Sequence, residues 1–204
     1  IDPNGNNIFD AKVNNISLRN INFSYTDKEV IKNRNLEISR GVTLIKGGNG
    51  CGKSTLVELL VGLYPSSYGG EIYYNNINIK LLDMYNLRKD KVVFCEQKNK
   101  INKENLITIK EQINKYEDMI FDIDIDIIKN IDTDNDLDVK SGGELQKLSL
   151  LSALKSNKEI IILDEPTTFL DVRAKTKLKE SIKKLKDDKI IIIIGHTNNF
   201  DDTA

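Results

Sequence analysis

The sequence has few of the residues that cross-link a fold or bind a metal. Its 204 residues include no tryptophan, three prolines, one histidine and two cysteines. Cys51 and Cys95 match neither the spacing of a zinc site nor that of a redox motif, which argues against both classes. A chain whose few cysteines stay as thiols suits a reducing compartment, so we expect a cytosolic environment.

Long apolar runs and an excess of either charge are also missing. The longest apolar runs, Ile160–Leu163 and Ile190–Ile194, fall far short of the roughly 20 residues that span a bilayer. No signal peptide is visible, and we expect the chain as given to be soluble. With 30 basic and 31 acidic residues, nothing predicts a polyanion-binding surface, so we expect no nucleic-acid partner.

What the sequence does contain is a glycine-rich stretch from Gly47 to Thr55, between the apolar run Val42–Ile45 and the helical pattern Leu56–Val61. Strand, glycine turn and helix in this order predict a phosphate-binding loop rather than an ordinary turn. Glycines let backbone N–H groups converge on phosphate oxygens, and the new helix directs its positive end at the anion. Lys53 would reach the β- and γ-phosphates, and the Ser54 hydroxyl would bind Mg²⁺.

Two carboxylates, Asp164 and Glu165, follow the apolar strand that starts near Ile160. Ligand groups gather at the carboxyl ends of strands in open α/β sheets. After a phosphate-binding loop, this favours Asp164 as a residue that holds Mg²⁺ through its water shell. Glu165 would orient and deprotonate an attacking water. The alternative is that the pair only caps the next helix.

Three other residues at strand ends are ambiguous from position alone. Tyr25 ends a strand with period-two alternation and could either stack on an adenine base or cover the core. Gln97 follows a short apolar strand and is first interpreted as an ordinary loop residue. His196, the single histidine, follows Ile190–Ile194; it is either incidental or a contact to the γ-phosphate and the attacking water.

Apolar residues at helical spacing within 104–130 predict a small helical insert, which is followed by a polar loop at 132–138. The alternating aspartates lack the glycine and terminal glutamate of a calcium-binding EF-hand, which favours a solvated face. The segment Ser141-Gly142-Gly143-Glu144 then opens a helix. Ser141 and Glu144 fit a capping box. The two glycines cost helix stability and favour the close approach of a large anion.

The remaining patterns predict the other elements. Short strands are expected at 16–25, 30–31, 36–38, 42–45, 71–74, 77–79, 92–95, 160–163 and 190–194, with a turn over 66–70 and a hairpin turn at Asn75-Asn76. A basic amphipathic helix is expected from Ala174 to Lys186, with its charges on a solvated face.

These residues together resemble the nucleotide-binding domain of ABC (ATP-binding cassette) transporters, over the chain from about Ile16 to His196. The motifs occur in the family's order: stacking aromatic Tyr25, Walker A Gly47–Ser54, Q-loop Gln97, signature Lys140–Glu144, Walker B Ile160–Glu165, D-loop Leu170-Asp171 and switch His196. The sequence departs from the family where Lys140 replaces the usual leucine and Glu144 the usual glutamine. The insert between Gln97 and Ser141 also looks shorter than in many exporter domains.

The resemblance implies an α/β fold of the P-loop ABC ATPase type. It has a parallel core sheet, an antiparallel β subdomain and a small helical subdomain at about 98–157. Residues 1–7 would be a linker or expression scar, and 8–204 the domain. Two copies would pair head to tail around two ATP, each bound between one copy's Walker A loop and the other's signature.

The resemblance also assigns roles to individual residues. The catalytic residues would be Lys53, Gln97, Glu165 and His196. Mg²⁺ would be held by Ser54, Gln97 and Asp164. ATP would be bound by Tyr25, Gly47, Asn49, Gly50, Cys51, Gly52, Lys53, Ser54 and Thr55, and by Ser141, Gly142, Gly143, Glu144 and Asp171.

The sequence around Tyr64–Ile72 and Asn86-Leu87-Arg88 is similar to exporter-type domains, including bacterial peptide and bacteriocin exporters. We therefore expect an ATP-hydrolysing motor domain at the cytoplasmic face of a membrane, with a transmembrane partner that is fused upstream or separate. The competing class is a non-transport ABC ATPase acting in translation, DNA repair or Fe–S assembly. A regulatory module without turnover is a third interpretation, against which the intact Glu165 argues.

Overall fold

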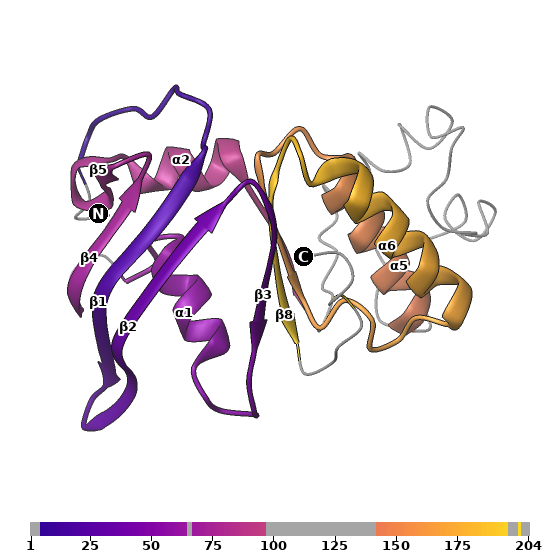
Figure 1. Cartoon of the computed structure of the whole chain (residues 1–204), viewed down its shortest axis with the longest axis horizontal. Helices are drawn as coiled ribbons and strands as arrows, with labels where there is room; N and C mark the ends of the chain where they lie inside the picture. Colours follow the sequence, from indigo (N-terminus) through magenta and orange to yellow (C-terminus); the bar gives the residue numbers. More distant parts are fainter. Residues whose placement is uncertain (1–4, 65–66, 97–141, 196–199, 201–204) are drawn as a thin grey trace, which may run out of the picture.

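A computed structural model gives the structure of the protein over residues 5–64, 67–96, 142–195 and 200. An antiparallel sheet and a parallel sheet of four strands each lie side by side, with helices packed on both (Figure 1). The elements are β1 (Asn15–Tyr25), β2 (Lys28–Ser39), β3 (Gly41–Lys46), α1 (Lys53–Leu60), β4 (Tyr68–Tyr74), β5 (Ile77–Asn78), η1 (Ile79–Leu81), α2 (Met84–Lys91), β6 (Val92–Cys95), α5 (Gly142–Lys155), β7 (Ile160–Asp164), α6 (Val172–Leu185) and β8 (Ile190–Gly195).

The parallel sheet has the order β3-β8-β7-β6 and is apolar on both faces because both are covered. Successive side chains alternate between the faces. One set packs with α1, α2 and the antiparallel sheet: Ile160, Ile162, Ile190, Ile192 and Ile194. The other set packs with α5 and α6: Ile161, Leu163, Ile191 and Ile193. The isoleucine runs thus form the boundary between two apolar cores.

The antiparallel sheet has the order β2-β1-β4-β5. Its predicted hairpin is confirmed, since Asn75 and Asn76 link β4 to β5 with φ of 46° and 67°, the positive values of a two-residue hairpin turn. The prediction of two strands at 30–31 and 36–38 is wrong. They form one strand, β2, because Asn33 enters the left-handed region (φ 42°) as an irregularity within the β1–β2 pairing, with its N–H bonded to Asn22.

Two further predictions need correction. The turn expected over 66–70 is shorter, because β4 already starts at Tyr68. The helix α2 was not predicted. It starts at the N-cap Asp83, whose side chain accepts a hydrogen bond from the Asn86 N–H, and its sequence is too polar to show a helical apolar face.

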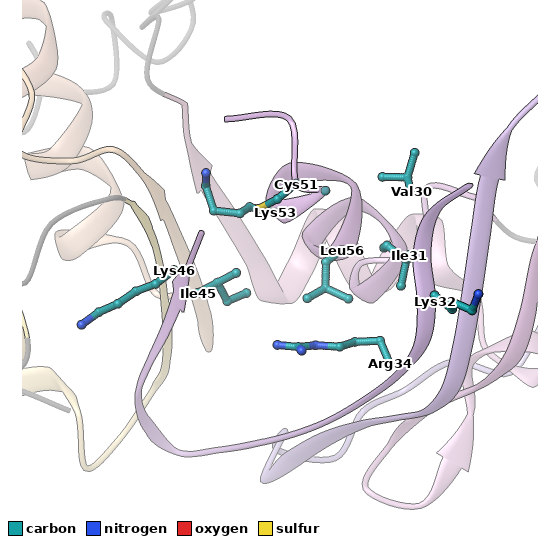
Figure 2. A pocket seen from close by; sticks show the side chains of 10 residues that line it. Val30, Ile31, Lys32, Arg34, Ile45, Lys46, Cys51, Lys53 and Leu56 are labelled. Carbon is teal, nitrogen blue, oxygen red and sulfur yellow. The ribbon is translucent and has the colours of Figure 1, made fainter. Parts of the chain in front are cut away.

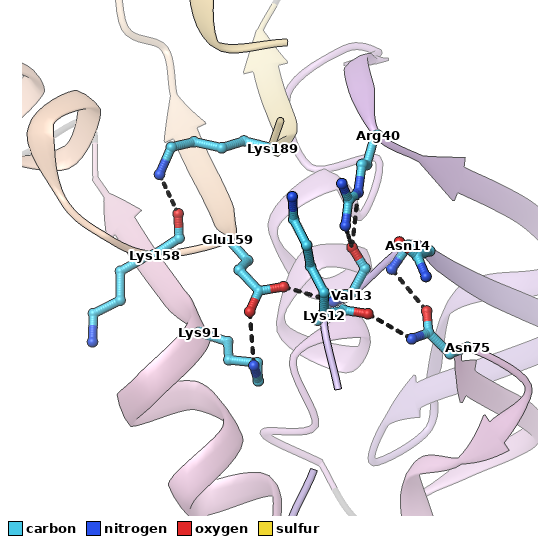
Figure 3. A network of polar contacts seen from close by, with 9 residues as sticks. All are labelled: Lys12, Val13, Asn14, Arg40, Asn75, Lys91, Lys158, Glu159 and Lys189. Carbon is cyan, nitrogen blue, oxygen red and sulfur yellow. Dashed lines mark hydrogen bonds and ion pairs between the residues drawn. The ribbon is translucent and has the colours of Figure 1, made fainter. Parts of the chain in front are cut away.

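A polar network ties the amino ends of β7 and β8 to the antiparallel sheet (Figure 3). The Glu159 carboxylate accepts hydrogen bonds from the Val13 N–H (2.6 Å) and from Lys91 Nζ (2.7 Å). Arg40 donates to the Val13 carbonyl, and Lys189 to the Lys158 carbonyl. This network lies at the end of the parallel sheet opposite the carboxyl ends of its strands, where it fixes how the two sheets meet.

The α/β architecture with a parallel core sheet and an antiparallel β subdomain is therefore confirmed. The predicted helical subdomain falls mostly outside the described residues, which contain only α5 from it. Within the described part of the chain, no helix is long and apolar enough to cross a membrane.

Candidate functional site

The carboxyl ends of the parallel strands bring the predicted site residues to one edge of the sheet. Lys46 at the end of β3 pairs with Gly195 at the end of β8, and Asp164 at the end of β7 pairs with Ile194. The glycine loop and Glu165 continue directly from these ends. β6 ends level with β7, since Cys95 pairs with Leu163. This register, rather than proximity in sequence, creates the site.

The glycine loop takes a conformation that its glycines make possible. Gly50 and Gly52 have φ of 75° and 92°, in the left-handed region that favours glycine. A Cβ on Gly52 would lie 2.9 Å from Val30 Cγ1, so glycine is also required for space. Gly52 is the N-cap of α1, and no side chain caps this helix start. The first N–H groups of α1 are therefore left to an anion.

Lys53 folds back over the loop that precedes it. Its Nζ donates to the carbonyls of Gly47 (2.8 Å) and Gly48 (3.0 Å). The ammonium thus lies beside the loop that it would serve, and phosphate oxygens could replace these carbonyl acceptors without moving the Lys53 backbone. An Arg could not fill this place equally well, because its planar group needs a different arrangement of acceptors.

A cleft of about 350 Å³ joins the loop to the carboxylates and to the end of β1. It is lined by Tyr25, Lys28, Val30, Asn49, Gly50, Gly52, Lys53, Ser54, Thr55, Asp164 and Glu165. Most of the residues that the sequence assigned to ATP, metal and catalysis within the described regions therefore surround one volume. Lys28 and Val30 were missed; they come from the start of β2, and nothing in the sequence near them signals a ligand.

Asp164 is half-buried at the end of β7. Burial and then the neighbouring Glu165 raise the pKa of its carboxyl; Lys53 opposes this effect and Glu96 adds to it. A carboxylate crowded by others is stabilised by a nearby cation. Oxygen ligands from one or two carboxylates plus substrate phosphates are what Mg²⁺ usually takes. Asp164 and the Ser54 hydroxyl on the same cleft fit this requirement. Among the described residues, no group of three or more His, Cys, Asp or Glu could hold an ion by itself.

Glu165 has a strained backbone, with φ of 48°. Such a conformation costs about 1–3 kcal/mol for a residue other than glycine and tends to occur at functional sites. Its N–H donates to the Ile194 carbonyl (2.9 Å), and its own carbonyl accepts from Thr168 Oγ1 (3.0 Å) and Gln146 Nε2 (3.3 Å). These bonds hold the turn that places the Glu165 side chain on the cleft.

Gln146 is a residue that sequence reasoning missed. It is fully buried (0% exposed), and its amide bridges two segments: Nε2 donates to the Glu165 carbonyl, and Oε1 accepts from the Phe169 N–H (3.1 Å). The signal was present in the sequence, since Gln146 shares one helix face with Leu150 and Ala153, where an apolar residue is expected. A buried amide at such a position needs partners, which here belong to the turn from Glu165 to Phe169.

Tyr25 ends β1 with its ring on the cleft and 42% of its surface exposed. Its hydroxyl lies 3.2 Å from Thr55 Oγ1 and 2.9 Å from the Tyr64 hydroxyl. The sequence left two interpretations, a base-stacking ring and a core aromatic. An exposed ring on the cleft favours the first.

The structure does not bring all predicted residues to this cleft. Asp171 instead caps α6, accepting from the Ala174 N–H (2.8 Å), and it pairs with Lys147 (3.8 Å). The hydrogen bond from Ala174 is the largest effect that lowers the pKa of Asp171. Gly142, Gly143 and Glu144 begin α5. Gln97, Ser141 and His196 lie outside the described residues.

A second hollow, of about 260 Å³, lies between β2 and β3 and beside the glycine loop (Figure 2). Arg34 points into it below Ile45 and Leu56, and Cys51 lies at its upper side. The Cys51 thiol packs against the loop, because a Cβ on Gly47 would come within 2.5 Å of its sulfur. Cys51 thus contributes to the shape of the loop, and its side chain lines this second hollow.

A family model described as "ABC transporter" matches residues 31–168 of the chain. The chain is 32% identical to the ATP-dependent lipid A-core flippase of Wigglesworthia glossinidia brevipalpis, over 89% of this chain and 34% of the flippase. It is 30% identical to the energy-coupling factor transporter ATP-binding protein EcfA1 of Staphylococcus aureus, over 90% of this chain and 72% of that protein. The chain therefore spans about a third of the first relative and most of the second.

Two solved structures share the fold. A bacterial Atm1-family ABC exporter with ATP bound matches with a TM-score of 0.78 and 22% identity, over 96% of this chain and 36% of the exporter chain. A dimeric ATP-binding cassette in a post-hydrolysis state, bound to ADP and Pi, matches with a TM-score of 0.68 and 26% identity, over 90% of this chain and 89% of that one.

Proposed function

Because the chain belongs to the ABC transporter family and is an ATP-hydrolysing domain of it, we propose that it is the motor of an exporter-type transporter. The observation that carries the proposal is the single cleft that unites Tyr25, the glycine loop, Asp164 and Glu165. Each part of ATP hydrolysis has a residue there: a ring for the base, N–H groups and an ammonium for the phosphates, and two carboxylates where the γ-phosphate would end.

Phosphate binding depends on the loop and on Lys53. The uncapped start of α1 offers N–H groups to the phosphates, and Lys53 exchanges its carbonyl acceptors at Gly47 and Gly48 for phosphate oxygens. Ser54 and Asp164 would hold Mg²⁺ between them, with Gln97 as the proposed further ligand. The ion would neutralise charge on the phosphates as it develops in the transition state.

Glu165 would orient the attacking water and accept its proton. Its backbone is held by Ile194, Thr168 and Gln146, so the carboxylate is placed before ATP binds. A positioned base contributes about 10²–10⁴-fold to a rate. His196, the residue after Gly195 in the sequence, is the proposed contact of the γ-phosphate.

We also propose that two copies pair head to tail. The glycine-rich start of α5, Gly142-Gly143, offers helix N–H groups to an anion. A second copy would supply these groups, with Ser141, to the ATP held by the first. Asp171, at the start of α6, would lie at the same interface. The dimeric relative with bound ADP and Pi supports this assembly.

The exporter assignment is supported by the flippase relative and by the exporter-like pattern around Tyr64–Ile72. EcfA1 is the ATP-binding protein of an energy-coupling factor transporter, so the test must distinguish a domain fused to its membrane partner from an ATP-binding protein on a separate chain. Cells of the source would be fractionated and blotted with an antibody against this domain. A membrane band several times heavier than 23.2 kDa supports a fused exporter. A membrane band near that mass means a separate membrane subunit, and a band only in the soluble fraction contradicts the transporter assignment.

A further inference from the structure

The hydroxyl of Tyr25 belongs to a compact network that lies beside the cleft. It is 2.9 Å from the Tyr64 hydroxyl, 3.2 Å from Thr55 Oγ1 and 3.5 Å from Glu58 Oε2. The Tyr64 hydroxyl also donates to Glu58 Oε2 at 3.1 Å. Tyr25 is thus held at the tip of its ring by groups from α1 and from the segment after it.

The Tyr25 ring is also restrained by aromatic neighbours. Phe23, which is 4% exposed, meets Tyr25 edge-on with centroids 4.8 Å apart, and Tyr64 at 4.9 Å. The Tyr25 and Tyr64 rings themselves lie 6.0 Å apart at 78°. Such edge contacts add about 0.5–1.5 kcal/mol each and fix ring orientation. Tyr25 is therefore held by two aromatic neighbours and still lines the cleft.

Tyr64 reaches this place because of how α1 ends. Gly62 has φ of 72°, its N–H donates to the Leu59 carbonyl, and the Leu63 N–H donates to the Glu58 carbonyl. These two bonds form a Schellman motif, which reverses the chain after the helix. The reversal brings Tyr64 back against the side of α1 that carries Glu58.

The hydrogen bond with Tyr25, with help from burial and Glu58, raises the pKa of Tyr64 well above its ordinary range. The Tyr64 hydroxyl therefore keeps its proton and remains a donor to the Glu58 carboxylate. Glu58 and Thr55 lie one turn apart on the helix whose first residue is Lys53. The helix that starts at the phosphates thus also carries the groups that hold Tyr25.

We propose that Tyr64 and Glu58 are positioning residues that set the ring of Tyr25 for stacking on the base of ATP. The inference rests on the proposed base-stacking role of Tyr25. A ring that is 42% exposed at a strand end would otherwise sample several orientations, and ordering it would cost affinity on binding. The network orders the Tyr25 ring before ATP binds, and it connects the base site to the phosphate site through α1.

The test compares a ligand with a base and one without. Affinities for ATP and for inorganic tripolyphosphate would be measured by calorimetry on the wild type, Tyr64→Phe and Glu58→Leu, neither of which can form the Tyr64–Glu58 hydrogen bond. We expect ATP binding to weaken by about 3- to 10-fold in both variants, the range of one hydrogen bond, with tripolyphosphate affinity and kcat at saturating ATP unchanged. The matched control is Tyr73→Phe, which removes another hydroxyl bonded to a carboxylate, 2.7 Å from Glu71, outside the cleft.

A double variant tests the route of the effect. If Tyr64 acts through Tyr25, Tyr25→Phe and Tyr64→Phe together weaken ATP binding no more than the stronger single change. Equal losses for ATP and tripolyphosphate would mean a general structural role and would overturn the inference. Unchanged ATP affinity in both positioning variants would also overturn it. Should Tyr25→Ala leave ATP affinity unaltered, the base-stacking role of Tyr25 itself is wrong.

Discussion

Replacing the buried amide of Gln146 tests what holds the turn from Glu165 to Phe169. In Gln146→Leu a side chain of similar size loses both hydrogen bonds, one to the Glu165 carbonyl (3.3 Å) and one from the Phe169 N–H (3.1 Å). At about 1 kcal/mol for each bond, the free energy of unfolding should fall by about 2 kcal/mol. The Glu165 carbonyl keeps Thr168 as a donor, whereas the Phe169 N–H loses its acceptor in a part-buried place.

The same change should reach catalysis. Relaxation of the strained Glu165 backbone would displace its carboxylate, so we expect kcat for ATP to fall by about tenfold, with little change in KM, because positioning errors act on the chemical step. Urea unfolding and steady-state ATP hydrolysis measure the two effects. Ser149→Ala, one turn along α5, removes a contact to the Cys95 thiol (3.3 Å) and serves as the control.

Two outcomes would refute this reasoning. If Gln146→Leu is less stable but hydrolyses ATP at the normal kcat, Gln146 is a structural residue with no influence on Glu165. If stability does not change, the two hydrogen bonds contribute nothing to the folded state.

Three further predictions follow from local geometry. Gly62→Ala should lower the free energy of unfolding by about 1–2 kcal/mol in urea, because φ is 72° and a Cβ would lie 3.0 Å from Met84 Cε; an unchanged midpoint would contradict the strain. Burial raises the pKa of Glu159, but the hydrogen bonds from Lys91 and Val13, together with the charges of Lys91 and Arg40, lower it below its ordinary value. Its contribution to stability should therefore be present above its unfolded pKa of about 4.3 and be lost as the pH falls through the lower folded value. Glu159→Gln should remove that part of the pH dependence of Tm. Asp171→Ala should lower Tm because α6 loses its cap, whereas Asp171→Asn should not; equal losses would show that charge, not capping, matters.

Much of the site could be predicted because its functional residues lie in short segments with recognisable sequence patterns. The glycine loop needs glycines at fixed places, and the Asp164-Glu165 pair follows an apolar strand that can only be buried. Knowing that these segments meet required the order of the strands, since β3, β8 and β7 come from distant parts of the sequence. The family resemblance predicted a parallel core sheet, and the order of its strands comes from the structure.

The residues that were missed act through contacts between distant segments. Gln146 looks like one polar residue among many until its partners at Glu165 and Phe169 are seen. The link from Tyr25 to Tyr64 depends on the turn at Gly62, which joins segments that the sequence does not connect by any pattern. The single strand β2 was predicted as two strands, at 30–31 and 36–38, whereas the sheet accommodates Asn33 between them as an irregularity in pairing.

The central claim is that Glu165 activates water for ATP hydrolysis in the cleft of the glycine loop. The most direct measurement is single-turnover ATP hydrolysis by Glu165→Gln, with ATP affinity measured on the same sample. We expect a rate at least about 10²-fold below the wild type, with ATP affinity retained, since a base is removed and the phosphate contacts stay. A Glu165→Gln protein that binds ATP normally and hydrolyses it at the wild-type rate would show that Glu165 is not the base.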